Sequence, residues 1–330
     1  MSQKQRAIPL LSICIPAFNR PEWLRRAMCS ILTTSIEKQS QIELIVSDDS
    51  TIPACKQVVD ELIANWHGHH HYCQNIPSLG MAGNWNHCIQ IASGEYVLLL
   101  HDDDYLETAA PDKILQTLQQ HSNASALLFG VNVVTSQQRI RKQQIFTSLQ
   151  PLTPESALEK ILTDSSFIRF PGIVLRKKIF QKIGYFDKTI GGIADIKMWV
   201  RVCHECGLLC VPIVTANYTV HDQALTMEMF NPQIVKGLQT LFNEVCSQGW
   251  LSPETLEKCK TNYFHQFILA GTVRHIRVWN IKKAKHVFSL FNQLELQPGL
   301  LKPKWKIIKH VLQIFLGLSA LTSGQQSSGA

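Results

Sequence analysis

Short apolar runs alternate with amphipathic segments along the first half of the chain. The apolar runs that predict buried strands cover residues 10–16, 42–47, 96–100 and 126–134, and residues 71–74 are interpreted as a further short strand. The segments that predict helices between them cover residues 22–33, 56–66, 84–92 and 111–121. Apolar strands that alternate with helices are typical of βαβ units, so this half predicts an α/β fold with a mostly parallel sheet.

The pattern changes after about residue 153. Further strands are predicted at residues 173–176, 208–213 and 216–220, and helices at residues 154–162, 178–183 and 194–206. Beyond residue 222 only helical patterns remain, at residues 233–249, 253–277 and 281–294. We therefore predict an α/β domain over residues 1–230 and a helical region over residues 231–330, with a frayed, polar end at residues 322–330.

Composition adds information about partners and compartment. Apolar residues make up 45% of the 330 residues and charged residues 17%, which is enough apolar surface for a folded core. The net charge of +7 suits an anionic lipid surface, a nucleic acid or a phosphorylated small molecule. The ten cysteines are scattered and no apolar signal sequence or long apolar span is visible, so we expect a cytoplasmic protein with free thiols and no transmembrane helix.

Polar loops follow three of the predicted strands directly. Residues 16–20 (PAFNR) follow the first strand, residues 48 and 49 are aspartates after the second, and residues 102–104 are aspartates after the strand at 96–100. Each loop alone also fits a turn or a helix cap. Ligands of open parallel sheets bind outside the carboxyl ends of strands, and carboxylates suit Mg²⁺ or Mn²⁺. Together the loops indicate a nucleotide-phosphate site with a metal.

Several other classes of protein lack support in the sequence. No phosphate-binding glycine loop of the kind found in nucleotide hydrolases is present, and no G-x-G-x-x-G opens the first predicted helix. No platform of interleaved aromatic and basic residues predicts nucleic-acid binding. For a protein with a metal and nucleotide-phosphate site, two alternative classes stay open: a nucleotidyltransferase, and a nucleotide-sugar-binding module without activity. The first would carry a glycine-rich basic loop where this chain has PAFNRPEW. The acids to which the family resemblance given next assigns nucleotide binding, metal binding and catalysis, Asp102, Asp103 and Asp195, argue against the second.

Four motifs stand in a fixed order along the chain, namely SICIPAFNR, IELIVSDDST, residues 75–96 and VLLLHDDDYL, and further segments lie at 182–187, 194–201 and 218–226. The four motifs resemble the family 2 inverting glycosyltransferases of bacterial surface-polysaccharide synthesis, and the further segments resemble the acceptor side of bacterial members. The resemblance implies a GT-A fold, a Rossmann-like sheet for nucleotide-diphospho-sugars, here with a C-terminal helical extension. It also implies metal-dependent transfer of a hexosyl or hexosaminyl group from a nucleotide-sugar donor, usually a UDP-sugar, to a saccharide or lipid-linked saccharide acceptor.

The same resemblance implies roles for the residues of the nucleotide site. Pro16, Ala17 and Asn19 would line the pocket of the base. Asp48 would accept a hydrogen bond from the base, and Asp102 would lie nearer the ribose.

Metal and acid–base roles follow from the resemblance as well. Asp103 would bind Mn²⁺ or Mg²⁺, with Asp104 in support and His221 at the metal or the diphosphate. Relatives carry an acid at the position of His101, which either faces the site or caps the strand. Asp195 would be the catalytic base, although from its position alone it equally fits the N-cap of the helix at residues 194–206.

The C-terminal region combines basic and apolar residues. Its basic residues are Arg274, Arg277, Lys282, Lys283, Lys285, Lys302, Lys304, Lys306 and Lys309, and residues 311–321 are mostly apolar. One interpretation is an amphipathic segment on an anionic bilayer, which would place the protein peripherally on the inner face of the cytoplasmic membrane. The other interpretation is a helical cap that packs on the catalytic domain and exposes its lysines to solvent.

Three further features are interpreted as structural rather than functional. The histidines of residues 67–71 are expected in a solvated loop, and Cys203 and Cys206 are expected to be buried thiols. Trp85 and Trp199 are predicted to be packing residues.

Overall fold

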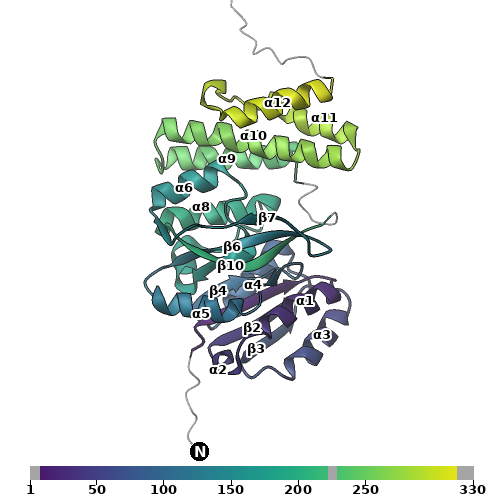
Figure 1. Cartoon of the computed structure of the whole chain (residues 1–330), viewed down its shortest axis with the longest axis vertical. Helices are drawn as coiled ribbons and strands as arrows, with labels where there is room; N and C mark the ends of the chain where they lie inside the picture. The colour runs from purple at the N-terminus through teal and green to yellow at the C-terminus, as the bar shows by residue number, and fades with distance from the viewer. Residues whose placement is uncertain (1–7, 222–228, 318–330) are drawn as a thin grey trace, which may run out of the picture. The chain divides into compact units, whose positions relative to one another are not determined.

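The computed structural model describes residues 8–221 and 229–317 (Figure 1). The chain forms two compact units, one of Met1–Ile161 with Ser166–Ala224 and one of Leu162–Ser165 with Leu225–Ala330. A functional division into residues 1–230 and 231–330 stays a prediction. Among the described residues, no helix is both long and apolar enough to cross a membrane.

The first unit contains the described strands and the helices among them, except that residues 162 and 163, at the end of one helix, fall in the second unit. The strands are β1 (Leu11–Ala17), β2 (Ile42–Asp48), β3 (His69–Gln74), β4 (Tyr96–Leu99), β5 (Tyr105–Leu106), β6 (Ala126–Thr135), β7 (Ile140–Gln144), β8 (Gln150–Leu152), β9 (Ile173–Arg176) and β10 (Leu208–Val220). The helices that follow or precede them are α1 (Pro21–Ile31), α2 (Ile36–Gln39), α3 (Ala54–Ile63), α4 (Met81–Ile91), α5 (Ala110–Gln120), α6 (Pro154–Thr163), α7 (Phe180–Ile183) and α8 (Ala194–Cys206), with short 3-10 turns η1 (Phe170–Gly172), η2 (Lys177–Ile179) and η3 (Gly191–Ile193).

All the strands of the described residues join one sheet. Its order is β3-β2-β1-β4-β9-β6-β10-β5, with β7 paired to β6 and β8 to β10. The longest pairings, β1 with β2 and β6 with β10, are parallel, whereas β9 lies antiparallel between β4 and β6. The α/β fold with a mostly parallel, Rossmann-like sheet is therefore confirmed.

Helices cover both faces of the sheet around β1. Leu11, Ile13 and Ile15 belong to the core that α1, α3 and α5 complete. Successive side chains of a strand point to opposite faces, and on the other face the thiol of Cys14 donates to the carbonyl of Cys88 in α4 at 3.7 Å. Burial on two faces explains why this strand is a continuous apolar run in the sequence.

The last strand of the sheet differs from its prediction. We expected two strands, at residues 208–213 and 216–220, but β10 is one strand of 13 residues. Its pairing with β6 shifts register between Val211 and Val214 and again before Ala216. These irregularities interrupt the alternation of side chains, which is why one strand has the pattern of two.

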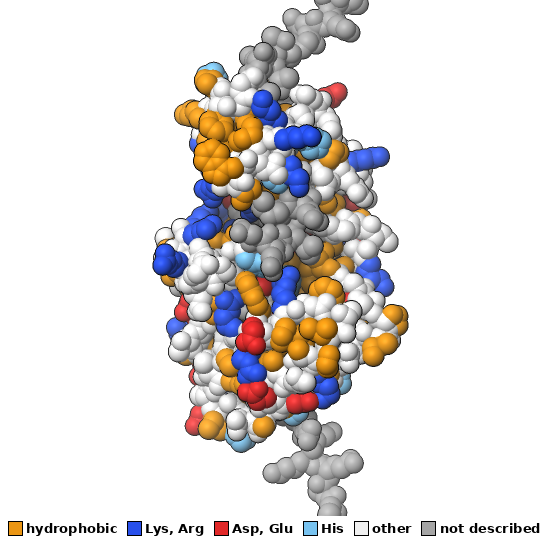
Figure 2. All heavy atoms as spheres, turned by 90° about the vertical axis from the view of Figure 1, so that its right-hand side faces the viewer, with side chains coloured by type: hydrophobic (Ala, Val, Ile, Leu, Met, Phe, Trp, Pro, Cys, Tyr) orange, Lys and Arg blue, Asp and Glu red, His pale blue; other side chains and the backbone are white. Residues whose placement is uncertain are grey.

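The second unit is helical throughout its described elements. They are α9 (Pro232–Ser247), α10 (Pro253–Arg277), α11 (Ile281–Ser289), η5 (Leu290–Gln293), η6 (Pro298–Leu300) and α12 (Pro303–Phe315). The side chains of Asn231 and Ser252 cap α9 and α10 by accepting from backbone N–H groups. On the face shown in Figure 2, hydrophobic side chains gather beside lysine and arginine side chains in the upper part, which these helices form.

Candidate functional site

The loop after β1 is tied to the loops after β2 and β4. Asn19 has φ 54°, a left-handed conformation that asparagine tolerates better than most residues. Its N–H donates to Ser50 Oγ at 2.7 Å, and its Oδ1 accepts from the N–H of Thr51 at 3.0 Å. The N–H of Phe18 donates to Asp102 Oδ2 at 3.0 Å. The structure thus brings together the three polar loops that the sequence singles out.

Two of the three consecutive aspartates share an arginine. Arg20 Nη1 donates to Asp102 Oδ1 at 3.2 Å and to Asp103 Oδ2 at 2.8 Å. His221 Nε2 lies 3.0 Å from the same Oδ2 of Asp103. His221 follows β10 and Arg20 precedes α1, so the sheet gathers this cluster from distant parts of the sequence.

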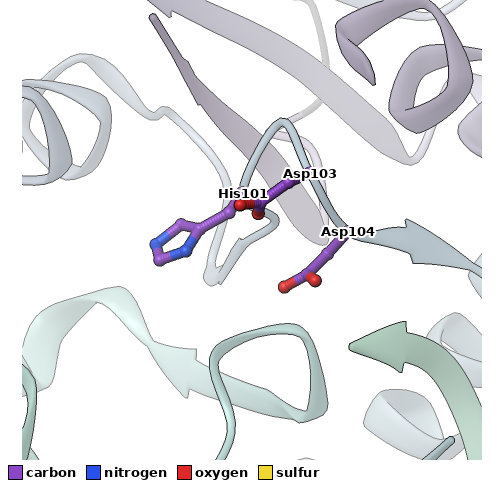
Figure 3. Close-up of side chains that lie close together, drawn as sticks. All are labelled: His101, Asp103 and Asp104. Carbon is purple, nitrogen blue, oxygen red and sulfur yellow. The ribbon is translucent and has the colours of Figure 1, made fainter. Parts of the chain in front are cut away.

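His101, Asp103 and Asp104 form a group that fits a metal ion. One potential ligand atom from each lies within 4.8 Å of the others, and the close-up shows the three side chains projecting from one loop (Figure 3). Asp104 Oδ1 accepts from the N–H of Thr219 at 2.8 Å. Within the described structure, Asp104 Oδ2 and His101 Nε2 are buried and have no hydrogen-bond partner. Such orphaned acceptors are costly unless a cation or water satisfies them.

The ionisation of the aspartates differs from one to the next. Burial, then repulsion by Asp103, raises the pKa of Asp102 to about 7. Burial and the same repulsion hold the pKa of Asp104 well above its usual range. Burial also opposes ionisation of Asp103, but the hydrogen bond from His221 and the nearby cationic groups lower its pKa. A bound cation would favour the charged form of all three carboxylates.

Arg26 supports this loop from α1, a role that the sequence did not reveal. Its Nη2 donates to the carbonyl oxygen of Asp103 at 2.5 Å and to Thr219 Oγ1 at 3.1 Å. Its guanidinium lies over the rings of Trp23 and Tyr105, at 4.9 Å and 4.5 Å from their centroids. Arg26 therefore holds the acidic loop against β10.

An aromatic cluster supports the ring of His101. The ring stacks on Trp85 at 5.3 Å between centroids and contacts Phe170 at 4.2 Å. Phe170 contacts Trp199 of α8 at 5.0 Å, and Phe186 contacts both tryptophans. Trp85 and Trp199 are buried packing residues, as predicted, and a ring nitrogen of His101 lies within 4.8 Å of a carboxylate oxygen of Asp103 and of one of Asp104.

Asp195 lies in the first turn of α8. Its Oδ1 accepts from the N–H of Ile196 at 2.7 Å, and burial raises its pKa to about 6 against the opposing effect of backbone N–H donors. The N-cap residue of α8 is Ile193, so Asp195 does not cap the helix. Trp199, which contacts Phe170 and Phe186, follows Asp195 by about one turn of α8.

The predicted base-binding residues lie at the ends of β1 and β2. Pro16 and Ala17 are the last residues of β1, where Ala17 pairs with Asp48. The carboxylate of Asp48 is buried and accepts from the N–H of Ser50 and from the hydroxyl of Tyr72, both at 2.9 Å. Each carboxylate oxygen has a second lone pair, so these contacts leave acceptor capacity for a ligand.

Asp49 has a structural role that the sequence did not predict. Its Oδ1 accepts from Asn75 Nδ2 at 2.8 Å and from the N–H of Leu79 at 3.1 Å, and its Oδ2 accepts from Ser78 Oγ at 2.8 Å. Asp49 therefore fixes the segment that leads into α4.

The histidine and cysteine segments are predicted to have no role in the site. His70 and His71 are exposed, but they lie on β3 rather than in a loop. Burial raises the pKa of the Cys203 thiol well above its usual range.

The chain matches one known protein family over more than half of its length. The sequence profile described as Glycosyl transferase family 2 matches residues 12–184. The chain belongs to this family.

The first relatives that the chain matches share between 25% and 29% sequence identity with it. The chain is 29% identical over 202 residues to the GalNAc(5)-diNAcBac-PP-undecaprenol beta-1,3-glucosyltransferase of Campylobacter jejuni, covering 60% of this chain and 61% of that one. It is 26% identical to the chondroitin synthase of Pasteurella multocida over 94% of this chain and 32% of that enzyme. The chain spans between 61% and 66% of the length of the first relatives that it matches.

Solved structures share the fold at low sequence identity. The Staphylococcus aureus TarS fragment 1–349 in complex with UDP-GlcNAc is similar with a TM-score of 0.63 at 13% identity, covering 94% of this chain and 93% of that one. The mannosyltransferase PcManGT of Pyrobaculum calidifontis, in complex with GDP-Man and Mn²⁺, has a TM-score of 0.54 at 13% identity, covering 94% and 85%.

Proposed function

We propose that this chain transfers a sugar, with inversion, from a nucleoside-diphosphate donor to an acceptor hydroxyl in a reaction that needs a divalent cation. The observation that carries the proposal is the pair of buried acceptors without partners, Asp104 Oδ2 and His101 Nε2, beside the ionised Asp103. The loops that surround them come from the carboxyl ends of parallel strands, where ligands of such sheets bind.

The donor set fits Mn²⁺ or Mg²⁺. Asp103 and Asp104 supply carboxylate oxygens, and His101 supplies a ring nitrogen whose pKa is lowered by burial, so the imidazole stays neutral. His221 would hold Asp103 in place through its Nε2, or contact the diphosphate. When bound, the cation would supply Lewis-acid stabilisation of the negative charge on the departing nucleoside diphosphate.

The nucleotide would occupy the loops after β1 and β2. Asn19, Pro16 and Ala17 would line the base, and Asp48 would accept from a base N–H, which suits uracil. Asp102 would accept hydrogen bonds from the ribose hydroxyls. The hydrogen bond from the N–H of Phe18 to its Oδ2 holds the carboxylate in a fixed orientation for this role. A UDP-sugar with a hexosyl or hexosaminyl group is the donor that these groups favour.

Asp195 would accept the proton of the acceptor hydroxyl. A general base works best when its pKa is near the operating pH, and burial brings the pKa of Asp195 to about 6. The hydroxyl oxygen attacks the anomeric carbon as the bond to the diphosphate breaks, and the proton passes to Asp195. Attack from the side opposite the leaving group inverts the anomeric centre.

The acceptor would be a saccharide or a lipid-linked saccharide. The Campylobacter relative is named for an acceptor on undecaprenol diphosphate, and other relatives are named as synthases of chondroitin and hyaluronan. These names support a place in bacterial surface-polysaccharide synthesis. For an acceptor carried on a lipid, we propose that the protein acts in the cytoplasm, peripherally at the inner face of the membrane.

The test is a panel of nucleotides with and without Mn²⁺ in a thermal-shift assay, followed by donor hydrolysis. We expect selective stabilisation by a nucleoside diphosphate with Mn²⁺, and release of sugar from one UDP-sugar. Preference for a nucleoside triphosphate would instead support a nucleotidyltransferase. Turnover that is indifferent to a chelator would remove the cation from the proposal.

A further inference from the structure

The positive charge of the chain is concentrated in one stretch of the second unit. Residues 274–317 hold nine lysine and arginine residues and a single acidic residue, Glu295. Their excess of eight positive charges is larger than the net charge of +7 of the whole chain, so the rest of the chain is close to neutral. Any anionic partner would therefore be attracted to this stretch.

Helix α12, within this stretch, has apolar residues on two faces. Leu312 and Leu316 are buried on the face that packs toward α10. Ile307, Val311 and Ile314 lie on another face at helical spacing and are 57–67% exposed, with Phe315 beside them at 58%. A helix that only caps a bundle needs one apolar face, so the interpretation as a cap does not account for the second.

The turn between α10 and α11 exposes a second apolar element. Trp279 is 86% exposed and has φ 56°, a conformation that is unusual for a bulky residue. Val278 beside it is 51% exposed. Arginines precede this turn and Lys282 and Lys283 follow it, so the apolar side chains again stand among cations. Tryptophan is enriched where one part of a side chain meets water and the other meets lipid.

We infer that the α12 face, defined by Ile307, Val311, Ile314 and Phe315, docks onto an anionic lipid bilayer. The apolar side chains would enter the boundary between headgroups and acyl chains, while Lys304 and Lys306 would meet the lipid phosphates. A second copy of the chain is a poorer occupant, because pairing this surface with itself would bring two highly positive segments together. This surface does not depend on the proposed transferase chemistry.

The test uses flotation of the full-length protein with vesicles of phosphatidylcholine alone or mixed with phosphatidylglycerol. We expect binding to the mixed vesicles, weaker binding at high salt, and little binding to the neutral vesicles. The double variant Ile307→Ser/Ile314→Ser should bind mixed vesicles about tenfold or more weakly. The variant Lys304→Gln/Lys306→Gln should show a similar loss of binding to the mixed vesicles, and it should show this loss only at low salt.

The matched control is Ile36→Ser/Ile140→Ser, which removes two isoleucines that are 67% and 57% exposed in the first unit. It should bind vesicles as the unaltered protein does, and all variants should bind UDP with Mn²⁺ equally. Absence of binding to mixed vesicles by the unaltered protein would overturn the inference. So would equal losses in the α12 variant and the control, or self-association that only the α12 variant abolishes.

Discussion

Arg20 Nη1 lies 2.8 Å from Asp103 Oδ2 and 3.2 Å from Asp102 Oδ1. One guanidinium thus balances two neighbouring carboxylates at the point where a divalent cation and a diphosphate are proposed to bind. An arginine in this position competes with the cation for the same oxygens, and it is also well placed to turn toward phosphate once the cation is bound.

The first prediction concerns this arginine. Arg20→Ala should strengthen the binding of Mn²⁺ alone by on the order of tenfold, because it removes a competing cation, and should weaken the binding of UDP with Mn²⁺. Titration calorimetry measures both. Arg25→Ala is the matched control, since Arg25 pairs with Glu61 on the surface. If Mn²⁺ alone binds Arg20→Ala no more tightly than the unaltered protein, the competition does not exist.

The second prediction concerns the proposed base. Asp195→Asn should lower kcat by about 10²–10⁴-fold, the usual contribution of a general base, while the binding of donor stays within a few fold. In the unaltered enzyme kcat/KM should rise with pH through an apparent pKa of about 6, because the base acts only when ionised. Loss of donor binding in Asp195→Asn, or a flat pH profile, would contradict the role.

The third prediction concerns stability. The pKa of Asp195 is raised in the folded protein to about 6 from an ordinary value of 3.8, so the folded state holds this proton more tightly than the unfolded state. The stability that this provides is full below about pH 4 and is lost as pH rises through 6, at a cost of about 1–3 kcal/mol.

Asp195→Asn avoids that cost, so its unfolding temperature should exceed that of the unaltered protein at pH 7.5 but not at pH 4. The difference between the two proteins isolates Asp195 from the other buried acids, which titrate in both. An equal difference at both pH values would mean that the charge of Asp195 is not what matters.

The fourth prediction concerns the cation. Asp103→Asn should weaken Mn²⁺ binding by about a hundredfold, since it removes the carboxylate that is most readily ionised. Binding is measured by electron paramagnetic resonance of free Mn²⁺. Asp60→Asn, which alters an exposed acid paired with Lys56, is the control for the loss of charge and should bind Mn²⁺ normally. Equal binding by both variants would place the cation elsewhere.

The fifth prediction concerns the aromatic cluster. Phe170→Leu and Phe242→Leu each remove a buried ring and should each cost about 1–2 kcal/mol in the free energy of unfolding. Only Phe170 contacts His101, so only Phe170→Leu should also weaken the binding of Mn²⁺. Denaturant unfolding and Mn²⁺ titration of both variants separate the two effects, and parallel changes in both would exclude a role for the cluster in holding His101.

Local patterns were sufficient for much of the fold. α8 and α10 begin and end at the predicted residues, because Gly207 ends α8 and the N-cap Ser252 with Pro253 starts α10. β1, β2 and β4 were recognisable because burial on both faces makes a strand apolar throughout. By contrast, β5 has two residues and β7 is an exposed polar strand, so neither has a hydrophobic pattern to detect.

The candidate site was predictable only in part, for a related reason. The acids after strands are visible in the sequence, but Arg26 and the ring of Phe170 reach the acidic loop through tertiary packing. The role of Asp49 also depends on tertiary packing. Its partners lie about thirty residues away in the chain, so no local sequence pattern predicts them. The roles of Asp48, Asp102 and Asp195 stay predictions until variants are measured.

The position of β10 has a consequence for the order in which the enzyme matures. Among the described residues it is the last strand in the sequence, yet it is inserted between β6 and β5, and it brings the N–H of Thr219 to Asp104 and His221 to Asp103. A nascent chain that has not yet released residues 208–221 from the ribosome cannot assemble these contacts. The acidic loop would therefore acquire its final geometry only after residues 208–221 have left the ribosome and joined the sheet.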